Sequence, residues 1–413
     1  MRLRIHRGAH EIGGNCIEVE ASGQSILLDL GAPLTGNLSP EEALPPVKGL
    51  VDGTNPNLLG IVISHPHADH YGLARLAHPS IPVHIGREAD MLLRAAIAFG
   101  PFGAAFPNVV HYRHRKPFQI GPLRLTPYLN DHSAFDAYSL LVEANGRSLF
   151  YSGDIRGHGW KSRMFEQLLG TGPKGVDAML LEGTTLGRKE EERTETEADL
   201  VKRLVKSITE TSGLVLAGFS GQNFDRLVTF YKATKIAHRN FVVDLYIAHL
   251  LRALGRKSLP DPTTGALRVF LPRHNKIKIV RDRAFDLVAP YRHRRIYPHE
   301  LRKRRKYLAM SFRPSMARDL ANAECLEGAK LIYSMWPGYL ERSTPNLHDW
   351  CHEHGVEFEI VHTSGHADAH DLKRLVQAVR PRRLIPIHTF TPGRYMELSD
   401  NATPLRDGVW TQV

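Results

Sequence analysis

The sequence Ile61-Val62-Ile63-Ser64-His65-Pro66-His67-Ala68-Asp69-His70 joins an apolar run to three histidines and one aspartate. The apolar residues predict a buried β-strand. Imidazole and carboxylate groups are preferred ligands of borderline divalent metals such as zinc. His65 and His67 are two residues apart and can point the same way, whereas Asp69 and His70 can face a second ion after the chain turns. A single such histidine would usually be structural, but four candidate ligands in six residues predict a metal site.

Composition places the chain among ordinary globular proteins. The 413 residues suffice for two domains, and the hydrophobic and charged shares are 42% and 23%. We find neither an apolar run near the ~20 residues that cross a bilayer nor the apolar core of a signal peptide. The three cysteines lack C-x-x-C spacing, which argues against a disulfide framework and a thiolate zinc site. We therefore expect a cytoplasmic protein without a membrane partner. The cysteines are Cys16, Cys325 and Cys351.

The formal net charge of +11 favours a polyanionic partner, nucleic acid first. The excess is uneven, because Arg292 to Lys306 holds eight Lys or Arg and one acid, Glu300. A basic run is often only a solvated surface. Both interpretations stay open for this segment.

Four later apolar segments are also followed by a residue that can bind a metal or can hold a metal-binding side chain in place. Strand ends that carry such side chains indicate that one edge of a sheet assembly holds the site. His132 would complete a three-histidine set with His65 and His67, and Asp154 could bridge two ions through its two oxygens. The segments are 123–128 before His132, 148–151 before Asp154, 178–181 before Glu182 and 383–387 before His388.

Two more residues fit this pattern. A buried strand predicted over 25–31 carries Asp29 near its end, and a buried carboxylate must be paired. Supporting a metal-binding histidine would satisfy it. His366 follows a strand predicted over 356–361 and precedes a helix over 369–379, where backbone N–H groups attract anions.

The pattern changes after about residue 190. Strands predicted at 213–219 and 240–244 alternate with helices at 224–237 and 247–254, which indicates a separate parallel α/β layer. The loop with Ser220, Gln222 and Asn223 would suit a phosphate, although ordinary helix capping explains it equally well. We expect the tail after His388 to be short and featureless.

In this order the motifs resemble those of the metallo-β-lactamase superfamily and, within it, the β-CASP nucleases such as ribonuclease J. The motifs are Asp29, the cluster His65-x-His67-x-Asp69-His70, His132, Asp154, Glu182, His366 and His388. The resemblance implies an α/β fold, an αββα sandwich over residues 1–189. An inserted β-CASP α/β domain over 190–355 would interrupt it, and 356–413 would complete it.

The resemblance also implies two zinc ions, with manganese as an alternative. His65, His67 and His132 would bind one ion, and Asp69, His70 and His388 the other, with Asp154 between them. Asp69 would also be catalytic, Glu182 and Asp29 would support the ligands, and His366 would contact the scissile phosphate or protonate the leaving group.

We expect a zinc-dependent ribonuclease that hydrolyses single-stranded RNA with a metal-bridged hydroxide and leaves 5′-phosphate ends, in endo or 5′-exo mode. Phosphate contacts are expected from a set of polar and backbone groups. These are Ser220, Gln222, Asn223, Arg313, Ser364, Gly365 and Ala367.

Three alternatives stay open. A DNA nuclease of the same family is disfavoured by His388, because the members that process DNA lack a histidine there. A small-molecule metallo-hydrolase would not need a basic insertion of roughly 160 residues. An inactive binding subunit would be expected to lose some of the seven ligands.

Two features depart from ribonuclease J. Only about 25 residues follow His388, so we expect its C-terminal domain to be lacking, and a homo-oligomer is left open. Glu182 stands in Glu-Gly-Thr-Thr, where ribonuclease J has Asp-Ser-Thr.

Overall fold

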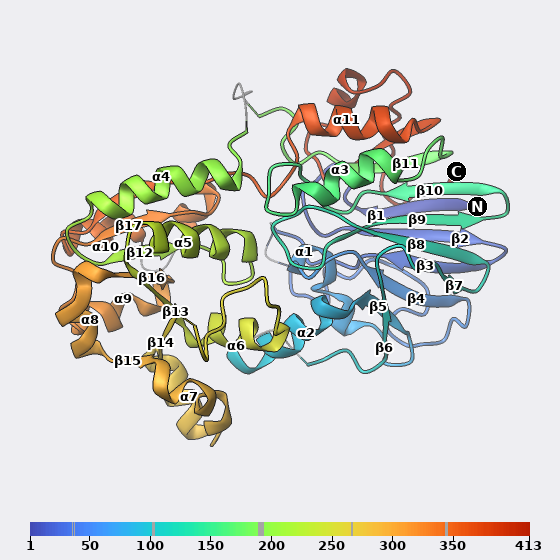
Figure 1. The fold of residues 1–413 in the computed structure, drawn as a ribbon. Coiled ribbons are helices and arrows are strands. Elements are labelled where there is room, and N and C mark those ends of the chain that lie inside the picture. Colours follow the sequence, from blue (N-terminus) through green and yellow to red (C-terminus); the bar gives the residue numbers. More distant parts are fainter. Residues whose placement is uncertain (35, 37, 101–103, 189–193, 266, 343–345) are drawn as a thin grey trace. The chain divides into compact units, whose positions relative to one another are not determined.

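The computed structural model describes residues 1–34, 36, 38–100, 104–188, 194–265, 267–342 and 346–413 (Figure 1). The chain forms two compact units. The first contains the chain up to Ile97, the stretch that ends at Thr194, and Gly365–Val413, and the second consists mainly of Glu195–Ser364. The boundary predicted after residue 355 therefore falls after Ser364. The reason is that β18 (Glu357–Ile360) pairs with β17 (Lys330–Tyr333) inside the second unit.

The first unit begins with a seven-stranded sheet of order β20-β1-β2-β3-β4-β5-β6. β1 to β3 form an antiparallel meander, and β3 to β6 run parallel. The prediction of a featureless tail is wrong, because β20 pairs with β1 at the sheet edge. The strands are β1 (Arg2–Arg7), β2 (Cys16–Ala21), β3 (Gln24–Leu28), β4 (Leu58–Ile63), β5 (Val83–Gly86), β6 (Val109–Tyr112) and β20 (Thr411–Gln412).

A second sheet of six strands has the order β19-β11-β10-β9-β8-β7. β7 to β10 are antiparallel neighbours, whereas β10, β11 and β19 are parallel. β19 joins this sheet after the chain has passed through the second unit, so the first unit is completed only by the end of the chain. The strands are β7 (Phe118–Ile120), β8 (Leu123–Leu129), β9 (Tyr138–Ala144), β10 (Arg147–Tyr151), β11 (Ala178–Glu182) and β19 (Arg383–Ile387).

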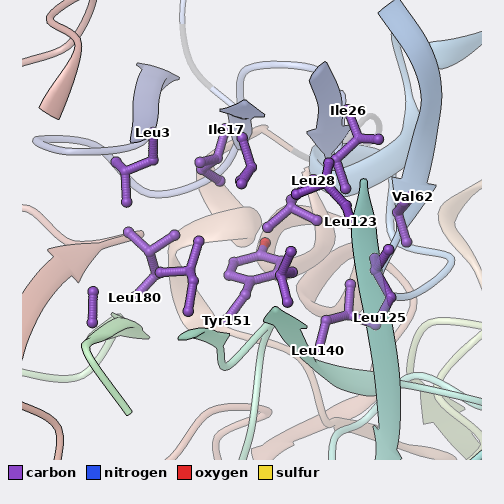
Figure 2. Close-up of a cluster of buried hydrophobic side chains, with 14 of the residues drawn as sticks. Leu3, Ile17, Ile26, Leu28, Val62, Leu123, Leu125, Leu140, Tyr151 and Leu180 are labelled. Atoms are coloured by element: carbon purple, nitrogen blue, oxygen red, sulfur yellow. The ribbon is translucent and has the colours of Figure 1, made fainter. Parts of the chain in front are cut away.

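The two sheets pack face to face. Figure 2 shows side chains from both, among them Ile17 and Leu28 of the first sheet and Leu140, Tyr151 and Leu180 of the second, in one buried cluster. Alternate residues of each strand point into this core, as the period-2 pattern requires. Burying such apolar surface stabilises the fold by about 25 cal/mol per Å².

Helices cover the outer faces. Tyr71 of α1 (Ala68–Tyr71) and Leu93 of α2 (Arg87–Ala96) pack against the first sheet. Phe165 of α3 (Ser162–Thr171) and Leu372 of α11 (Ala369–Val379) pack against the second, and Figure 1 shows these two helices together. The expected αββα sandwich is therefore confirmed.

The second unit is built on a parallel seven-stranded sheet of order β15-β14-β13-β16-β12-β17-β18. This confirms the inserted α/β layer. The remaining strands are β12 (Val215–Gly218), β13 (Asn240–Asp244), β14 (Arg268–Phe270), β15 (Arg295–Ile296) and β16 (Leu308–Phe312). The helices are α4 (Glu197–Glu210), α5 (Phe224–Ile236), α6 (Leu245–Leu254), α7 (Arg273–Arg281), α8 (Pro298–Arg304), α9 (Ala317–Asn322) and α10 (Leu347–Glu353).

Membrane-spanning helices are absent from the described part of the chain, since none of its helices is both long and apolar enough.

Candidate metal centre

The first candidate ligand set gathers side chains from three strand ends of the first unit. His65 and His67 follow β4, His132 follows β8, and Asp154 follows β10. Asp154 Oδ2 lies 3.6 Å from His65 Nε2 and 3.8 Å from His132 Nε2. His132 Nε2 lies 3.2 Å from His67 Nδ1. The set contains the three histidines that the sequence predicted for one ion.

The second candidate set shares Asp154 with the first. It adds Asp69 and His70 from α1 and His388 from the end of β19. His70 Nε2 lies 3.3 Å from Asp154 Oδ2 and 3.8 Å from Asp69 Oδ2. His388 Nε2 lies 3.4 Å from Asp69 Oδ2. The fold thus brings together side chains that are more than 300 positions apart in the chain.

The donor atoms fit a metal ion in both spacing and saturation. Two ligands about 2.1 Å from a tetrahedral ion are about 3.4 Å apart, which matches these separations. Among the described residues, His65 Nε2, His70 Nε2 and both carboxylate oxygens of Asp154 are buried without a hydrogen-bond partner. Buried polar atoms normally have partners. A cation in each set would supply them.

Electrostatics prepare the histidines of the first set for ligation. Burial lowers the pKa of His65 and of His132 well below the ordinary value, and it lowers the pKa of His67 to about 4. All three imidazoles are therefore neutral at pH 7 and can offer a lone pair.

The second set prefers positive charge. Burial lowers the pKa of His70, but the carboxylates of Asp154, Asp29 and Asp69 outweigh it and raise this pKa well above the ordinary value. Burial likewise raises the pKa of Asp154, yet His388, His70 and His366 hold it well below the usual range. These carboxylates stabilise a positive charge at this position, and a divalent cation would take the place of the proton on His70.

Asp29 orients His70 from behind. Its side chain is fully buried, with Oδ2 2.6 Å from His70 Nδ1. Ser64 donates its backbone N–H to Asp29 Oδ1 at 2.6 Å and its hydroxyl to Oδ2 at 2.8 Å, and the Tyr151 hydroxyl also donates to Oδ2. A carboxylate that accepts Nδ1–H leaves Nε2 of the imidazole as the lone pair that faces the ligand set.

His388 is held in a similar way by a residue that our sequence analysis did not single out. Thr184 Oγ1 lies 2.8 Å from His388 Nδ1, so Nε2 is directed to Asp69. His388 and Asp29 both have left-handed backbone, with φ of 52° and 57°. Such φ values are unfavourable for side chains with a Cβ and concentrate at functional sites.

His366 and Glu182 form a pair beside the second set. His366 Nδ1 lies 3.2 Å from Glu182 Oε1, and Glu182 also accepts backbone N–H groups of Ile155 and Thr184. Burial lowers the pKa of His366, but Glu182 and Asp154 outweigh this effect and raise it. The imidazole is therefore disposed to carry a proton near neutral pH.

A loop after Asp154 holds the loop that carries His132. Lys161 Nζ donates to the carbonyl of His132 at 2.7 Å, and Gly159 N–H donates to Asp131 Oδ2 at 2.7 Å. The guanidinium of Arg156, which is fully buried, lies 3.7 Å from Asp131 Oδ1. Our sequence analysis did not single out Arg156, Gly159 and Lys161. The one available signal was the presence of charged side chains close after a buried strand.

The predicted phosphate-binding residues of the second unit lie at the carboxyl ends of its parallel strands. Gln222 Nε2 donates to the Tyr246 hydroxyl at 2.9 Å, and the Arg313 guanidinium lies 4.8 Å from the Tyr246 ring. Asn223 caps α5 by accepting from Arg226 N–H at 2.9 Å. Ser220 is exposed in the same loop. Capping therefore explains Asn223, and Tyr246 joins Gln222 to Arg313.

At that edge the connections from two adjacent strands also run in opposite directions along the sheet. β12 and β16 are adjacent, yet the chain leaves β12 toward β13 on one side and leaves β16 toward β17 on the other. Ligands of open α/β sheets bind in the crevice at such a point.

The three small residues around His366 have different environments. Ser364 ends the second unit. A Cβ at Gly365 would come 2.9 Å from Ser133 Oγ, so the chain passes close to the His132 loop there. Ala367 is buried, its N–H donates to the Ile155 carbonyl, and its own carbonyl accepts from Thr185. The prediction that Ala367 binds phosphate is corrected, because its N–H is used to hold the segment in place.

Known proteins resemble this chain in sequence. Residues 25–211 match the model of the beta-lactamase superfamily domain, and residues 356–389 match that of the Zn-dependent metallo-hydrolase RNA specificity domain. Ribonuclease J of Sinorhizobium meliloti is 23% identical over 387 residues, which cover 88% of this chain and 64% of that protein. Ribonuclease J of Mycobacterium tuberculosis is 24% identical over 419 residues, which cover 94% of this chain and 68% of that protein.

A solved structure shares the fold. The crystal structure of a protein of unknown function from Enterococcus faecalis V583 matches with a TM-score of 0.80 at 20% identity, covering 99% of each chain. The chain spans 64% of the length of the Sinorhizobium meliloti relative and 55% of ribonuclease J from Helicobacter pylori.

Proposed function

We propose that the chain, which matches the beta-lactamase superfamily domain over residues 25–211, is a metal-dependent hydrolase of the β-CASP branch of that superfamily and acts as a ribonuclease. In this proposal it binds two zinc ions, or manganese in their place, and hydrolyses phosphodiester bonds of single-stranded RNA to leave 5′-phosphate ends. The observation that carries the proposal is the pair of ligand sets that share Asp154, with the His366–Glu182 pair beside them.

The ligand sets account for hydrolysis. Ions held there would activate a water molecule at neutral pH and neutralise phosphate oxygens. Asp29 and Thr184 direct the Nε2 atoms of His70 and His388 toward the ligand sets through contacts of 2.6 and 2.8 Å at Nδ1. The Asp29 carboxylate, which can only accept, keeps His70 in the tautomer that can ligate through Nε2, and Thr184 holds the orientation of the His388 ring.

His366 is proposed as the proton donor. The departing 3′-oxygen of a cleaved phosphodiester needs a proton, and a histidine with a raised pKa can supply it near pH 7. Glu182, 3.2 Å from Nδ1, would hold the ring and stabilise its charged form.

RNA as the substrate is supported by charge and by the relatives. The net charge of +11 suits a polyanion. The matched RNA specificity model and the relatives named ribonuclease J favour RNA over DNA. Ser220, Gln222 and Arg313 at the carboxyl edge of the second unit's sheet are proposed to contact the backbone.

The test is cleavage of 5′-labelled single-stranded RNA and DNA of the same sequence, with zinc or manganese. Asp69→Asn is compared with Asp90→Asn, a buried aspartate that binds Arg94 and His111 outside the ligand sets. We expect RNA cleavage that is lost in Asp69→Asn and kept in Asp90→Asn. Single nucleotides or longer fragments would distinguish exo from endo action.

Cleavage of DNA alone would replace the proposal with a DNA nuclease. If the metal-loaded protein cleaves neither polymer, nuclease function is rejected and a small-molecule hydrolase is favoured.

A further inference from the structure

The segment Arg292–Lys306 of the second unit is rich in cations, and several of them lie outside ion-pair distance of every carboxylate that the structure describes. It holds eight Lys or Arg and one acid, Glu300. That carboxylate accepts the N–H of Tyr297 at 3.0 Å and lies 3.4 Å from Arg268, which is outside the segment. Glu300 therefore serves the start of α8 and the neighbouring strand.

Acids from elsewhere reach only part of the segment. Arg302 pairs with Glu324 at 2.6 Å, and Arg305 pairs with Glu327. Throughout the described ranges, no carboxylate lies within ion-pair distance of the exposed residues Arg292, Lys303 and Lys306. Three exposed charges of one sign in 15 residues attract a polyanion.

Two tyrosines lie among these cations. The side chain of Tyr307 is 63% exposed, and its ring has no aromatic or cation–π neighbour within the part of the chain that the structure describes. Tyr297 is 44% exposed, with the Arg295 guanidinium 4.8 Å from its ring and the His299 ring parallel to it at 6.0 Å. An exposed ring beside cations is what a nucleic-acid base can stack on.

The segment is held on a rigid support. Leu301 on the inner side of α8 is fully buried, and Ile296 of β15 and Tyr291 are buried as well. Residues four apart on a helix share a face, so His299 and Lys303 project from the same side of α8. Figure 1 shows α8 at the edge of the sheet that ends in β15. The backbone that carries the cations and rings is thus anchored before any ligand arrives, which lowers the entropic cost of binding.

We propose that this surface, called here the basic aromatic surface and consisting of residues 292–307, binds single-stranded RNA in addition to the metal centre. RNA as the ligand rests on the proposed function. A single strand is favoured over a duplex, because only unpaired bases can leave their stack to lie on Tyr307. None of the residues of this surface belongs to the ligand sets, so it would increase the time that a long RNA stays bound and would not change the chemical step.

The charge contribution is tested by RNA binding at several salt concentrations. All proteins carry His366→Ala so that the bound RNA stays intact and the metal ligands are kept. Arg292→Gln/Lys303→Gln/Lys306→Gln is compared with Arg113→Gln/Lys116→Gln/Lys174→Gln. The control removes the same charge from three exposed residues of the first unit.

We expect the surface variant to bind a 30-nucleotide RNA roughly tenfold more weakly at 0.1 M salt, with a salt slope reduced by about 2, since each phosphate contact on a single strand contributes about 0.7. The control should move affinity by less than about twofold, as loss of exposed charges outside the binding surface would.

Stacking is tested at one position. Tyr307→Ala should weaken binding about tenfold, whereas Tyr307→Phe, which keeps the ring, should bind like the parent protein. If both variants lose RNA affinity equally, stacking on Tyr307 is rejected. If Tyr307→Ala binds RNA like the parent protein, the aromatic part of the basic aromatic surface is rejected.

Activity separates this proposal from the proposed function. With His366 restored, the triple variant should raise KM for the long RNA about tenfold and keep kcat, while a dinucleotide should be cut at the parental rate. If the parent cuts and binds RNA but the triple variant equals its control, only the basic aromatic surface is rejected. If the protein binds double-stranded RNA as tightly as single-stranded RNA, the basic aromatic surface is also rejected. If the parent protein neither binds nor cuts RNA, the proposed function is rejected.

Discussion

Asp29→Asn isolates the role of one hydrogen bond in preparing a metal ligand. The substitution keeps size and removes the charge of a fully buried side chain. The amide oxygen can still accept the Ser64 N–H, but the amide nitrogen replaces Oδ2, which lies 2.6 Å from His70 Nδ1. An amide N–H can only donate, so His70 must turn its Nδ1 lone pair toward position 29 and carry its proton on Nε2.

The expected loss of metal affinity follows from the proton on Nε2, which blocks ligation by His70. An imidazole with Nε2–H cannot ligate, so His70 must either change tautomer against an unfavourable partner or drop out of the second set. A hydrogen bond to a charged group contributes about 1.5–3 kcal/mol, and loss of such a support typically costs 10–100-fold in metal affinity. The ligand set of His65, His67 and His132 does not contact Asp29. We therefore expect 10–100-fold weaker binding of one ion and parental binding of the other.

The assay is calorimetric titration of metal-depleted protein with Zn²⁺, with bound metal counted by elemental analysis. Asp90→Asn controls for loss of a buried carboxylate, because Asp90 bonds Arg94 and His111 away from the ligands. Circular dichroism reports whether each variant is folded. If a folded Asp29→Asn binds both ions within twofold of the parental affinities, the tautomer argument is refuted.

Three further predictions concern stability, packing and thiol chemistry. Burial lowers the pKa of His84 to about 4, whereas the unfolded chain takes up this proton near pH 6.5, so the unfolded state binds more protons between these values. Stability should therefore fall by up to about 3 kcal/mol as pH drops from 6.5 to 4, and urea titrations of His84→Leu should show a flatter pH profile. A Cβ at Gly31 would lie 1.7 Å from the Asp69 carbonyl, so Gly31→Ala should displace α1 and weaken both metal binding and stability. Gly170→Ala, where the added Cβ meets nothing within 4 Å, should alter neither, and parental zinc affinity in Gly31→Ala would contradict the close approach. Burial raises the pKa of all three cysteine thiols, so a disulfide reagent at pH 8 should label none in the native protein and three after denaturation.

Much of the candidate site was predictable because its residues follow apolar strands in the chain. His65, His67, Asp69 and His70 stand directly after β4, and a strand end is visible as the point where hydrophobic periodicity stops. The αββα class and the inserted parallel layer could be predicted for the same reason, together with the resemblance of the motifs.

The contacts that orient those ligands were not predictable. Asp29 meets Tyr151 from 122 positions away, and Thr184 meets His388 from 204 positions away. The assignment of β18 to the second unit and of β20 to the edge of β1 likewise depended on which strand each one pairs with.

The sequence by itself determined which chemical groups are available, in which order, and at which strand ends, because burial and strand periodicity are local properties of the chain. Only the tertiary structure decided which nitrogen of each imidazole faces the ligand sets and which carboxylate both sets share. The physical reason is that hydrogen bonds and ligand distances depend on sheet register and on how the two sheets pack. Those relations join residues far apart in the chain, and no local pattern records them.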